Sequence, residues 1–240
     1  YLEKVIESKK KLYGYRNSNL SIYNQMLDDF EPGMDEEKYD AFFAALKERL
    51  VPLIQKVTKA KQLREDFLTQ SFPVEEQKKF MEGLLEYLHF DSSWGYQNES
   101  EHPFTSWTCE NDCRTTTKYI ENNVISSILS TVHEVGHAYY EHNINPKYDG
   151  MILSEGVSSG MHESQSRLCE NYLGRTLAFW KYHYPRLQKH FPKQLGEVSL
   201  EEFYQAINVS KPSFIRTEAD ELTYPLHVLI RYEIEKGLFN

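Results

Sequence analysis

Apolar residues recur at helical spacing along most of the chain, and this pattern predicts a mainly α-helical protein. The clearest apolar stripe comprises Ile120, Val124, Ile128 and Val132, with Ile125 and Leu129 beside it. Residues four apart lie one above the other on one face of a helix. Because His133 and His137 continue the second stripe, we expect both imidazoles to point towards the interior of the protein.

The preceding segments also carry helix patterns and helix boundaries. We expect helices over residues 1–13 and 22–30, a break at Pro32 and Gly33, and a long helix from the N-cap Asp35 to about residue 63. Pro52 is expected to bend this long helix. Its predicted interior face comprises Phe42, Phe43, Leu46, Leu50, Leu53 and Ile54. A further helix begins near Pro73 and buries Phe80, Leu84, Leu85 and Leu88.

Strand patterns replace helix patterns just before the histidine segment. Residues 91–101 are polar with aromatic insertions and predict a loop, whereas residues 102–117 favour strands. Asp112, Arg114 and Thr116 alternate, so a strand would place all three on one face. On spacing alone, this is an ordinary polar strand face with an Asp–Arg pair, at the edge of a small sheet beside the histidine helix.

Helix patterns return after the histidine segment. They predict a helix over residues 159–173 that ends at Gly174, and a later helix that begins with a capping box formed by Ser199 and Glu202. A last helical region follows Pro212 and contains residues 215–220. Pro225 is expected to bend or restart it.

Residues 133–137 read His-Glu-x-x-His, which is the spacing of a zinc site on a helix. His133 and His137 can hold one Zn²⁺, and Glu134, about 100° round the helix, can act as general base on a water at the metal. The motif alone is also compatible with two core histidines. Gly136 favours the metal site, because a glycine inside a helix costs about 1 kcal/mol relative to alanine. Such a glycine indicates that another backbone or a substrate comes close.

A catalytic zinc ion usually has three protein ligands, so we expect a third ligand downstream. The candidates are Glu141, His142, Glu155, His162, Glu163 and Glu170. The first two continue the same helix past its metal-facing end. Spacing alone favours Glu163, with His162 and Glu155 as alternatives. Glu163 also precedes Arg167 by four residues, which is the spacing of an ordinary exposed salt bridge on a helix.

Composition excludes several classes of protein. The net charge of −9 argues against a nucleic-acid-binding surface, and no apolar run approaches the ~18 residues that a membrane helix needs. The 3 cysteines, Cys109, Cys113 and Cys169, do not form a secreted disulfide framework. Cys109 and Cys113 lack the second cysteine pair of a structural zinc site. Buried, reduced thiols fit better and indicate a cytoplasmic protein.

Several motifs occur together in this chain. In chain order they are His102-Pro103-Phe104, Asp112-x-Arg114-x-Thr116, His133-Glu134-x-x-His137, His162-Glu163-Ser164-Gln165-Ser166-Arg167 and Ile215-Arg216-x-x-Ala219-Asp220. This set resembles the thermostable (Taq-type) metallocarboxypeptidase family, and its order is far more specific than the zinc motif alone. The resemblance covers roughly residues 100–225 by motif.

The resemblance implies a mainly α, zincin-like helical fold with a substrate groove and a small β-sheet edge beside the HExxH helix. It implies that Glu163 is the third metal ligand and that the metal is Zn²⁺, with Co²⁺ possible. Members of the family are cytoplasmic homodimers that act on peptides.

The resemblance also implies residues that bind the substrate. Arg216 is the first choice for binding the C-terminal carboxylate of a peptide, and Asp220, four residues on, could hold its side chain. Arg114 is the alternative anchor. The segments that contain His102 and Arg114 are implied to close one end of the groove. Tyr224 and His227 are candidates for a phenol or imidazole that assists the reaction.

The family's later motif, Gly-x-x-Gln-Asp-x-His-Trp, does not occur in these residues. We therefore expect residues 1–240 to be a single catalytic-domain fragment, the central part of a longer carboxypeptidase. Residues 1–100 are expected to form a helical groove wall, and residues 101–240 the metal-site region.

The sequence therefore predicts a metallocarboxypeptidase that removes C-terminal residues from peptides by attack of a zinc-activated water. A related helical zinc oligopeptidase, which cuts internally, would use the same ligands and lack a fixed cation for the substrate's C-terminus. A non-catalytic helical module with a fossil site is a third interpretation, and intact His133, Glu134 and His137 argue against it. No nucleic acid or membrane is expected as a partner.

Overall fold

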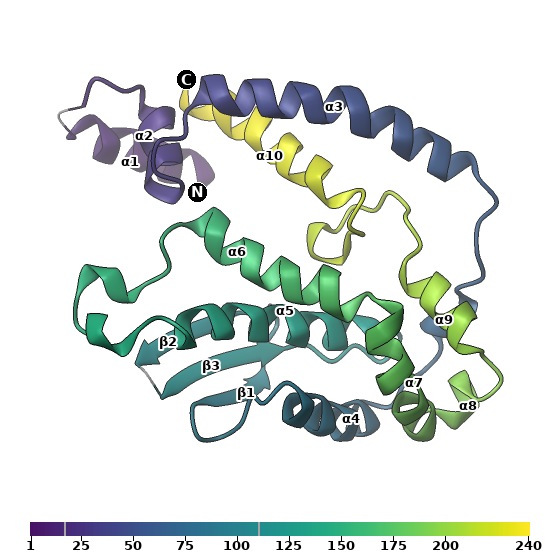
Figure 1. Ribbon diagram of the computed structural model, residues 1–240. Coiled ribbons are helices and arrows are strands. Elements are labelled where there is room, and N and C mark those ends of the chain that lie inside the picture. The colour runs from purple at the N-terminus through teal and green to yellow at the C-terminus, as the bar shows by residue number, and fades with distance from the viewer. Residues whose placement is uncertain (17, 110) are drawn as a thin grey trace. The chain divides into compact units, whose positions relative to one another are not determined.

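A computed structural model describes residues 1–16, 18–109 and 111–240. The chain divides into two compact units: unit 1 comprises Tyr1–Lys61, Ser158–Gly160 and Ser210–Asn240, and unit 2 comprises Gln62–Val157 and Met161–Val209. Helices dominate, and a small sheet lies in unit 2 (Figure 1), so the predicted mainly helical fold class is confirmed. Among the described helices, none combines the length and apolar character needed to cross a membrane.

Unit 1 is built from helices around one aromatic core. Its elements are α1 (Leu2–Gly14), α2 (Ile22–Phe30), α3 (Glu36–Lys59), the 3₁₀ turn η5 (Arg216–Glu218) and α10 (Tyr224–Phe239). Asp35 caps α3 as predicted, because its side chain accepts from the backbone N–H of Lys38 at 2.9 Å. The core comprises Tyr23, Met26, Phe43, Leu229, Tyr232 and Phe239.

Two predictions for unit 1 are corrected by the structure. Phe43 and Ile54 of α3 are buried, but Phe42 is 56% exposed and Leu53 is 47% exposed. A single stripe of α3 enters the core, so residues beside that stripe remain at the surface. In the last predicted helical region, residues 215–220 form only the short turn η5, and the regular helix α10 starts at Tyr224, next to Pro225, where a restart was expected.

Unit 2 holds the remaining elements. They are η1 (Asp66–Thr69), α4 (Val74–Tyr87), β1 (Gly95–Glu99), β2 (Thr105–Cys109), β3 (Asp112–Thr117), α5 (Val124–His142), η2 (Pro146–Tyr148), η3 (Ile152–Ser154), α6 (Ser159–Arg167), the π-helical segment η4 (Leu168–Gly174), α7 (Leu177–His190), α8 (Pro192–Leu195) and α9 (Leu200–Ile207). Two residues of α6, Ser159 and Gly160, fall in unit 1. Ser199 and Glu202 form the predicted capping box of α9.

The sheet has the strand order β1-β3-β2. Strand β1 pairs with β3 in parallel, with Gly95 opposite Cys113, and β2 pairs with β3 antiparallel. Two expectations were therefore wrong: β1 lies in the predicted loop, and β3 is the central strand and not an edge. The polar β1 carries no apolar alternation, and it forms because pairing with β3 satisfies its backbone N–H and C=O groups.

Helix α5, which carries the His-Glu-x-x-His motif, begins at Val124 because Asn123 caps it. The apolar stripe from Val124 to Val132 is buried as predicted, whereas Ile120 precedes the helix and is only partly buried. Hydrogen bonds from three neighbouring elements fix its position: Ser127 Oγ donates to Gln77 Oε1 of α4 at 3.0 Å, Thr117 Oγ1 of β3 donates to the Ser127 carbonyl at 3.1 Å, and Gln97 Nε2 of β1 donates to Thr131 Oγ1 at 3.1 Å. The motif is thus presented by a helix that is rigidly held.

Figure 1 shows the sheet and the α6–η4 helix on opposite sides of α5. The helix predicted over residues 159–173 is present, but its last part is the π-helical η4, which ends at Gly174. The three cysteines are free: Cys113 is buried and Cys169 is partly buried, as expected for reduced thiols, whereas Cys109 is exposed.

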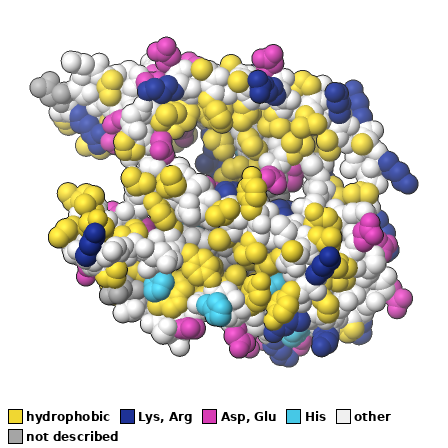
Figure 2. Space-filling model, in the orientation of Figure 1, with side chains coloured by type: hydrophobic (Ala, Val, Ile, Leu, Met, Phe, Trp, Pro, Cys, Tyr) yellow, Lys and Arg dark blue, Asp and Glu magenta, His cyan; other side chains and the backbone are white. Residues whose placement is uncertain are grey.

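The segment between α5 and α6 exposes a run of apolar side chains. Met151 is 57% exposed, Ile152 96%, Leu153 65% and Val157 71%. Hydrophobic side chains gather where this segment lies, at the left of the face that Figure 2 shows. This part of unit 2 is therefore an apolar surface that lies outside the core.

Candidate metal centre

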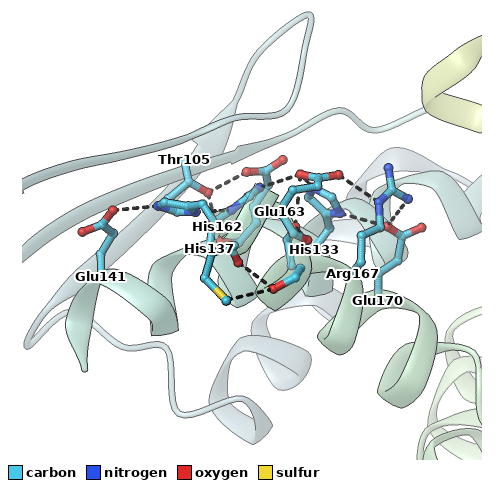
Figure 3. A network of polar contacts seen from close by, with 12 residues as sticks. Thr105, His133, His137, Glu141, His162, Glu163, Arg167 and Glu170 are labelled. Carbon is cyan, nitrogen blue, oxygen red and sulfur yellow. Dashed lines mark hydrogen bonds and ion pairs between the residues drawn. The ribbon is translucent and has the colours of Figure 1, made fainter. Parts of the chain in front are cut away.

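His133 and His137 of α5 and Glu163 of α6 each place one possible ligand atom within 4.8 Å of the others (Figure 3). Glu163 Oε2 lies 3.6 Å from His133 Nε2 and 3.3 Å from His137 Nε2. Atoms bound at about 2.0–2.1 Å to one tetrahedral ion lie about 3.3–3.4 Å apart. Two imidazoles and a carboxylate at this spacing fit a single divalent cation such as zinc.

In both imidazoles, Nδ1, the ring nitrogen that faces away from Glu163, has a hydrogen-bonding partner. His133 Nδ1 lies 2.8 Å from Glu170 Oε2. His137 Nδ1 lies 2.6 Å from His162 Nδ1, and His162 Nε2 lies 2.6 Å from Glu141 Oε1. One set of neutral tautomers satisfies all of these contacts: each histidine of the motif donates from Nδ1, and His162 donates to Glu141. The Nε2 lone pairs of His133 and His137 are then free to bind a metal.

These contacts separate the candidates for the third ligand. Both ring nitrogens of His162 are engaged, and Glu141 and Glu170 lie behind the imidazoles. Glu155 is exposed in the loop after η3. The ring of His142 stacks on Trp94, with ring centroids 4.1 Å apart. Glu163 is therefore the candidate whose carboxylate faces both Nε2 atoms.

Glu163 is held in an ionised state by its surroundings. Burial raises the pKa of Glu163, but its contacts with His137, His133 and Arg167 outweigh burial and lower the pKa to about 2. Arg167 Nε donates to Glu163 Oε1 at 2.9 Å, and its side chain is only 24% exposed. The pair is the i,i+4 salt bridge that the spacing indicated, but with the Glu163 side chain 40% exposed it is partly buried, and it belongs to a larger network.

Glu134, the acidic residue inside the motif, is 6% exposed. Thr105 of β2 approaches it: Thr105 Oγ1 lies 2.6 Å from Glu134 Oε2 and 2.9 Å from the Glu134 carbonyl oxygen. The carboxylate is thus oriented by the adjacent strand. Sequence reasoning missed Thr105, because only the packing of β2 on α5 brings it to Glu134.

Gly136 allows α6 to approach α5. A Cβ atom at Gly136 would lie 2.7 Å from Ser166 Cα, 3.0 Å from Cys169 Cβ and 3.0 Å from the Gln165 carbonyl oxygen. The expectation that another backbone or a substrate comes close to Gly136 is confirmed for the backbone. Glu163 can face the two histidines only because the helices lie this close.

Gly136→Ala is expected to destabilise the protein by about 1–3 kcal/mol, because the added methyl group overpacks the contact between α5 and α6. It should also weaken metal binding, since Glu163 moves with α6. Thermal unfolding and chelator competition measure the two effects. Gly237→Ala on α10 is the matched control, because beyond its chain neighbours and the backbone of its own helix no described atom lies within 4 Å of the added methyl group. Equal unfolding temperatures of wild type and Gly136→Ala would contradict the close-approach explanation.

The predicted substrate residues of unit 2 lie in and before the sheet. His102 is exposed in the turn before β2, and its carbonyl oxygen accepts from Ser100 Oγ at 2.6 Å. Arg114 is exposed on β3, where its Nε and Nη2 donate to the two carboxylate oxygens of Asp112 at 2.8 and 2.7 Å. This is the Asp–Arg pair that spacing alone indicated.

The other predicted substrate residues lie in unit 1. Arg216 Nη1 donates to Tyr224 Oη at 2.7 Å. The expectation that Asp220 holds Arg216 was wrong: Asp220 accepts from Ser210 Oγ, and from the backbone N–H and Oγ1 of Thr223 just before α10. His227 lies in the first turns of α10 and is partly buried.

Two imidazoles one turn apart, a carboxylate from the following helix and an acidic residue within the motif are typical of helical zinc metallopeptidases. Residues 1–240 match the family described as Carboxypeptidase Taq (M32) metallopeptidase, and the chain belongs to this family. The resemblance recognised from the motifs is confirmed over the whole chain.

Individual relatives agree with this assignment. The chain is 45% identical over 241 residues to Carboxypeptidase 1 of Bacillus subtilis (strain 168), covering 100% of this chain and 48% of that protein. It is 41% identical over 219 residues to Thermostable carboxypeptidase 1 of Thermus thermophilus, covering 91% of this chain and 43% of that protein.

A solved structure shows the same fold. The M32 carboxypeptidase from Deinococcus radiodurans R1 superposes with a TM-score of 0.93 at 38% identity, covering 100% of this chain and 48% of that one. The chain thus spans about half the length of the relatives that it matches.

Proposed function

We propose that the intact protein that carries this chain is a metallocarboxypeptidase, which hydrolyses the last peptide bond of a peptide. The observation that carries this proposal is the convergence of His133, His137 and Glu163 in a chain of the M32 family. Zn²⁺ is the proposed metal, with Co²⁺ as a substitute, because a set of two imidazoles and one carboxylate suits such ions. A zinc ion held there would act as a Lewis acid towards the scissile carbonyl and would acidify a water molecule.

The residues of this chain have separate tasks in the proposed reaction. His133, His137 and Glu163 hold the metal, and their outer partners keep the Nε2 atoms directed inward. Glu134 takes the proton from the attacking water and later delivers it to the leaving amine. Thr105 orients the Glu134 carboxylate through the 2.6 Å hydrogen bond to Oε2.

An enzyme that removes only the final residue must recognise a free carboxylate, and a guanidinium does so with two parallel hydrogen bonds. We propose Arg216 for this task, with Arg114 as the alternative. The bond from Arg216 to Tyr224 supports the first choice, because this partner of the guanidinium is a hydroxyl group and not a carboxylate. Arg114 is already paired with the carboxylate of Asp112. His102, Tyr224 and His227 are proposed to contact the substrate.

Arg216→Ala is expected to raise KM for free-acid peptides and to cost about 2–4 kcal/mol in kcat/KM, as loss of a charged hydrogen-bonding partner does. The variant should also lose most of the discrimination between a peptide acid and its C-terminal amide. The measurement is kcat/KM for that acid–amide pair with the intact wild-type and variant proteins.

Arg114→Ala is the matched comparison for this experiment. If only Arg114→Ala removes the preference for the acid, a carboxylate anchor exists but it is Arg114. If the wild type cleaves the amide as well as the acid, no carboxylate anchor exists and the oligopeptidase interpretation is favoured.

Digestion of one unblocked peptide by the intact protein, followed by mass spectrometry, tests the proposed function. A ladder of products shortened from the C-terminus supports a carboxypeptidase, and internal fragments support an endopeptidase. Elemental analysis of the purified protein tests the non-catalytic interpretation, which predicts that no stoichiometric metal is bound.

The family resemblance further supports the proposals that the intact protein is a homodimer and that it acts in the cytoplasm. Sedimentation equilibrium of the intact protein tests the first, since a monomer mass at working concentrations would contradict it. Cell fractionation tests the second, since recovery outside the cytoplasmic fraction would contradict it.

A further inference from the structure

Arg167 lies between two carboxylates beside the proposed metal ligands (Figure 3). Its Nε donates to Glu163 Oε1 at 2.9 Å, and its Nη1 donates to Glu170 Oε2 at 2.9 Å. Glu170 Oε2 also lies 2.8 Å from Nδ1 of His133. One guanidinium therefore contacts one proposed ligand directly and reaches a second ligand through a single carboxylate.

The two oxygens of Glu163 have different partners. Oε1 accepts from Arg167 Nε, whereas Oε2 lies 3.6 Å from His133 Nε2 and 3.3 Å from His137 Nε2. Oε2 also accepts from Ser166 Oγ at 3.3 Å, but it is the oxygen that faces both Nε2 atoms, whereas the strong, charged donor Arg167 engages Oε1. Arg167 thus favours monodentate binding through Glu163 over binding through both oxygens.

The carboxylate of Glu170 needs positive charge around it. Its side chain is only 11% exposed, and a buried carboxylate is costly unless it is paired. Arg175 Nη2 lies 3.6 Å from Glu170 Oε1, so Arg167 supplies the shorter of the two arginine contacts.

The planar guanidinium suits this place for a geometric reason. Its N–H donors form a rigid fork, so Nε and Nη1 can point to two separate carboxylates at fixed angles. A lysine ammonium carries the same charge on a flexible stem and lacks this fixed geometry.

We propose that Arg167 is a positioning residue of the metal centre, which holds Glu163 in a monodentate orientation and fixes the ring of His133 through Glu170. The inference rests on the proposed metal site. It adds to that site a residue that is not a ligand and yet determines how two of the ligands meet the ion.

The first experiment compares the wild-type and Arg167→Met intact proteins by chelator competition for Zn²⁺. We expect Arg167→Met to lower zinc affinity by about 10–100-fold, which is the usual effect of losing an outer partner of metal ligands. The metal-free variant should keep the far-ultraviolet circular dichroism of the metal-free wild type, which separates a change at the site from general unfolding.

The second measurement is the visible absorption spectrum of the Co²⁺-loaded proteins, which reports coordination number and geometry. We expect weaker d–d bands for Arg167→Met, because a released Glu163 can add its second oxygen to the ion. Arg167→Lys keeps the positive charge but lacks the fixed N–H donors of the guanidinium. This variant should therefore fold, and its zinc affinity should lie between those of Arg167→Met and the wild type. Arg64→Gln is the control, since Arg64 is 57% exposed and pairs with Asp66 away from the site.

Different outcomes separate this inference from the proposed metal site. If the wild type binds no Zn²⁺, the proposed site itself is wrong, and the inference falls with it. If the wild type binds Zn²⁺ and Arg167→Met binds it equally well, or gives the same Co²⁺ spectrum, the site stands and the role of Arg167 is overturned. If Arg167→Lys recovers the full zinc affinity of the wild type, the argument from the fork geometry is overturned, because a positive charge alone would then be enough to position the ligands.

Discussion

Glu134→Gln is expected to lower kcat of the intact protein by about 10²–10⁴-fold, which is the usual contribution of a general base. Its zinc content should not change, because Glu134 is not among the three side chains that converge on the proposed ion. The amide cannot accept the proton of the attacking water. Its oxygen can still accept from Thr105, which lies 2.6 Å from Glu134 Oε2, so the side chain should keep its place. Peptide turnover and metal per protein are measured on the same samples.

The control for this variant is Glu101→Gln. Glu101 lies in the same unit, is 94% exposed and pairs with Lys118 at the surface. The Glu101→Gln variant should have the same peptide turnover and the same zinc content as the wild type. A Glu134→Gln protein that keeps more than a few per cent of the wild-type activity would show that another residue is the general base.

Glu163→Ala is expected to weaken zinc binding by more than about 100-fold. This exceeds the usual effect of losing a residue that only hydrogen bonds to a metal ligand. The reason is that it removes one of three proposed ligands and leaves two imidazoles. Glu163 Oε2 faces Nε2 of both motif histidines, at 3.6 and 3.3 Å. Chelator competition on the intact protein measures the affinity.

His162→Ala is the sharpest comparison, because His162 is the adjacent residue. Its two ring nitrogens face His137 Nδ1 and Glu141 Oε1, both at 2.6 Å, so we propose that it supports the proposed ligand His137 and is not itself a ligand. We expect a smaller loss of zinc affinity, about 10–100-fold. If His162→Ala releases the metal and Glu163→Ala retains it, the assignment of the third ligand is wrong.

Features that depend on nearby residues were predicted well from the sequence. The cap of α3 by Asp35 and the capping box of Ser199 and Glu202 use side chains and backbone groups three residues apart. The apolar stripe of α5 was visible because burial of one helix face repeats every three to four residues. The same regularity places His133 and His137 on one face.

Features that depend on pairing between distant residues were predicted poorly. Strand β1 has no apolar alternation, and its formation follows from hydrogen bonds to β3.

A local contact was also predicted wrongly. Asp220 was expected to hold Arg216 because the two are four residues apart, but residues 215–220 contain only a 3₁₀ turn and no regular α-helix. Without the helix, the i,i+4 spacing no longer brings the two side chains together.

The sequence by itself determined the family of this chain, its helical class and the candidate ligands His133, His137 and Glu163. The spacing and the order of the motifs can be read directly from the linear sequence. Only the tertiary structure decided which groups contact the proposed ligands: Glu170 contacts His133, the His162–Glu141 pair contacts His137, and Arg167 lies between Glu163 and Glu170. These contacts exist because Gly136 lets α6 approach α5. The distance between two helices cannot be predicted from the spacing of residues within either helix.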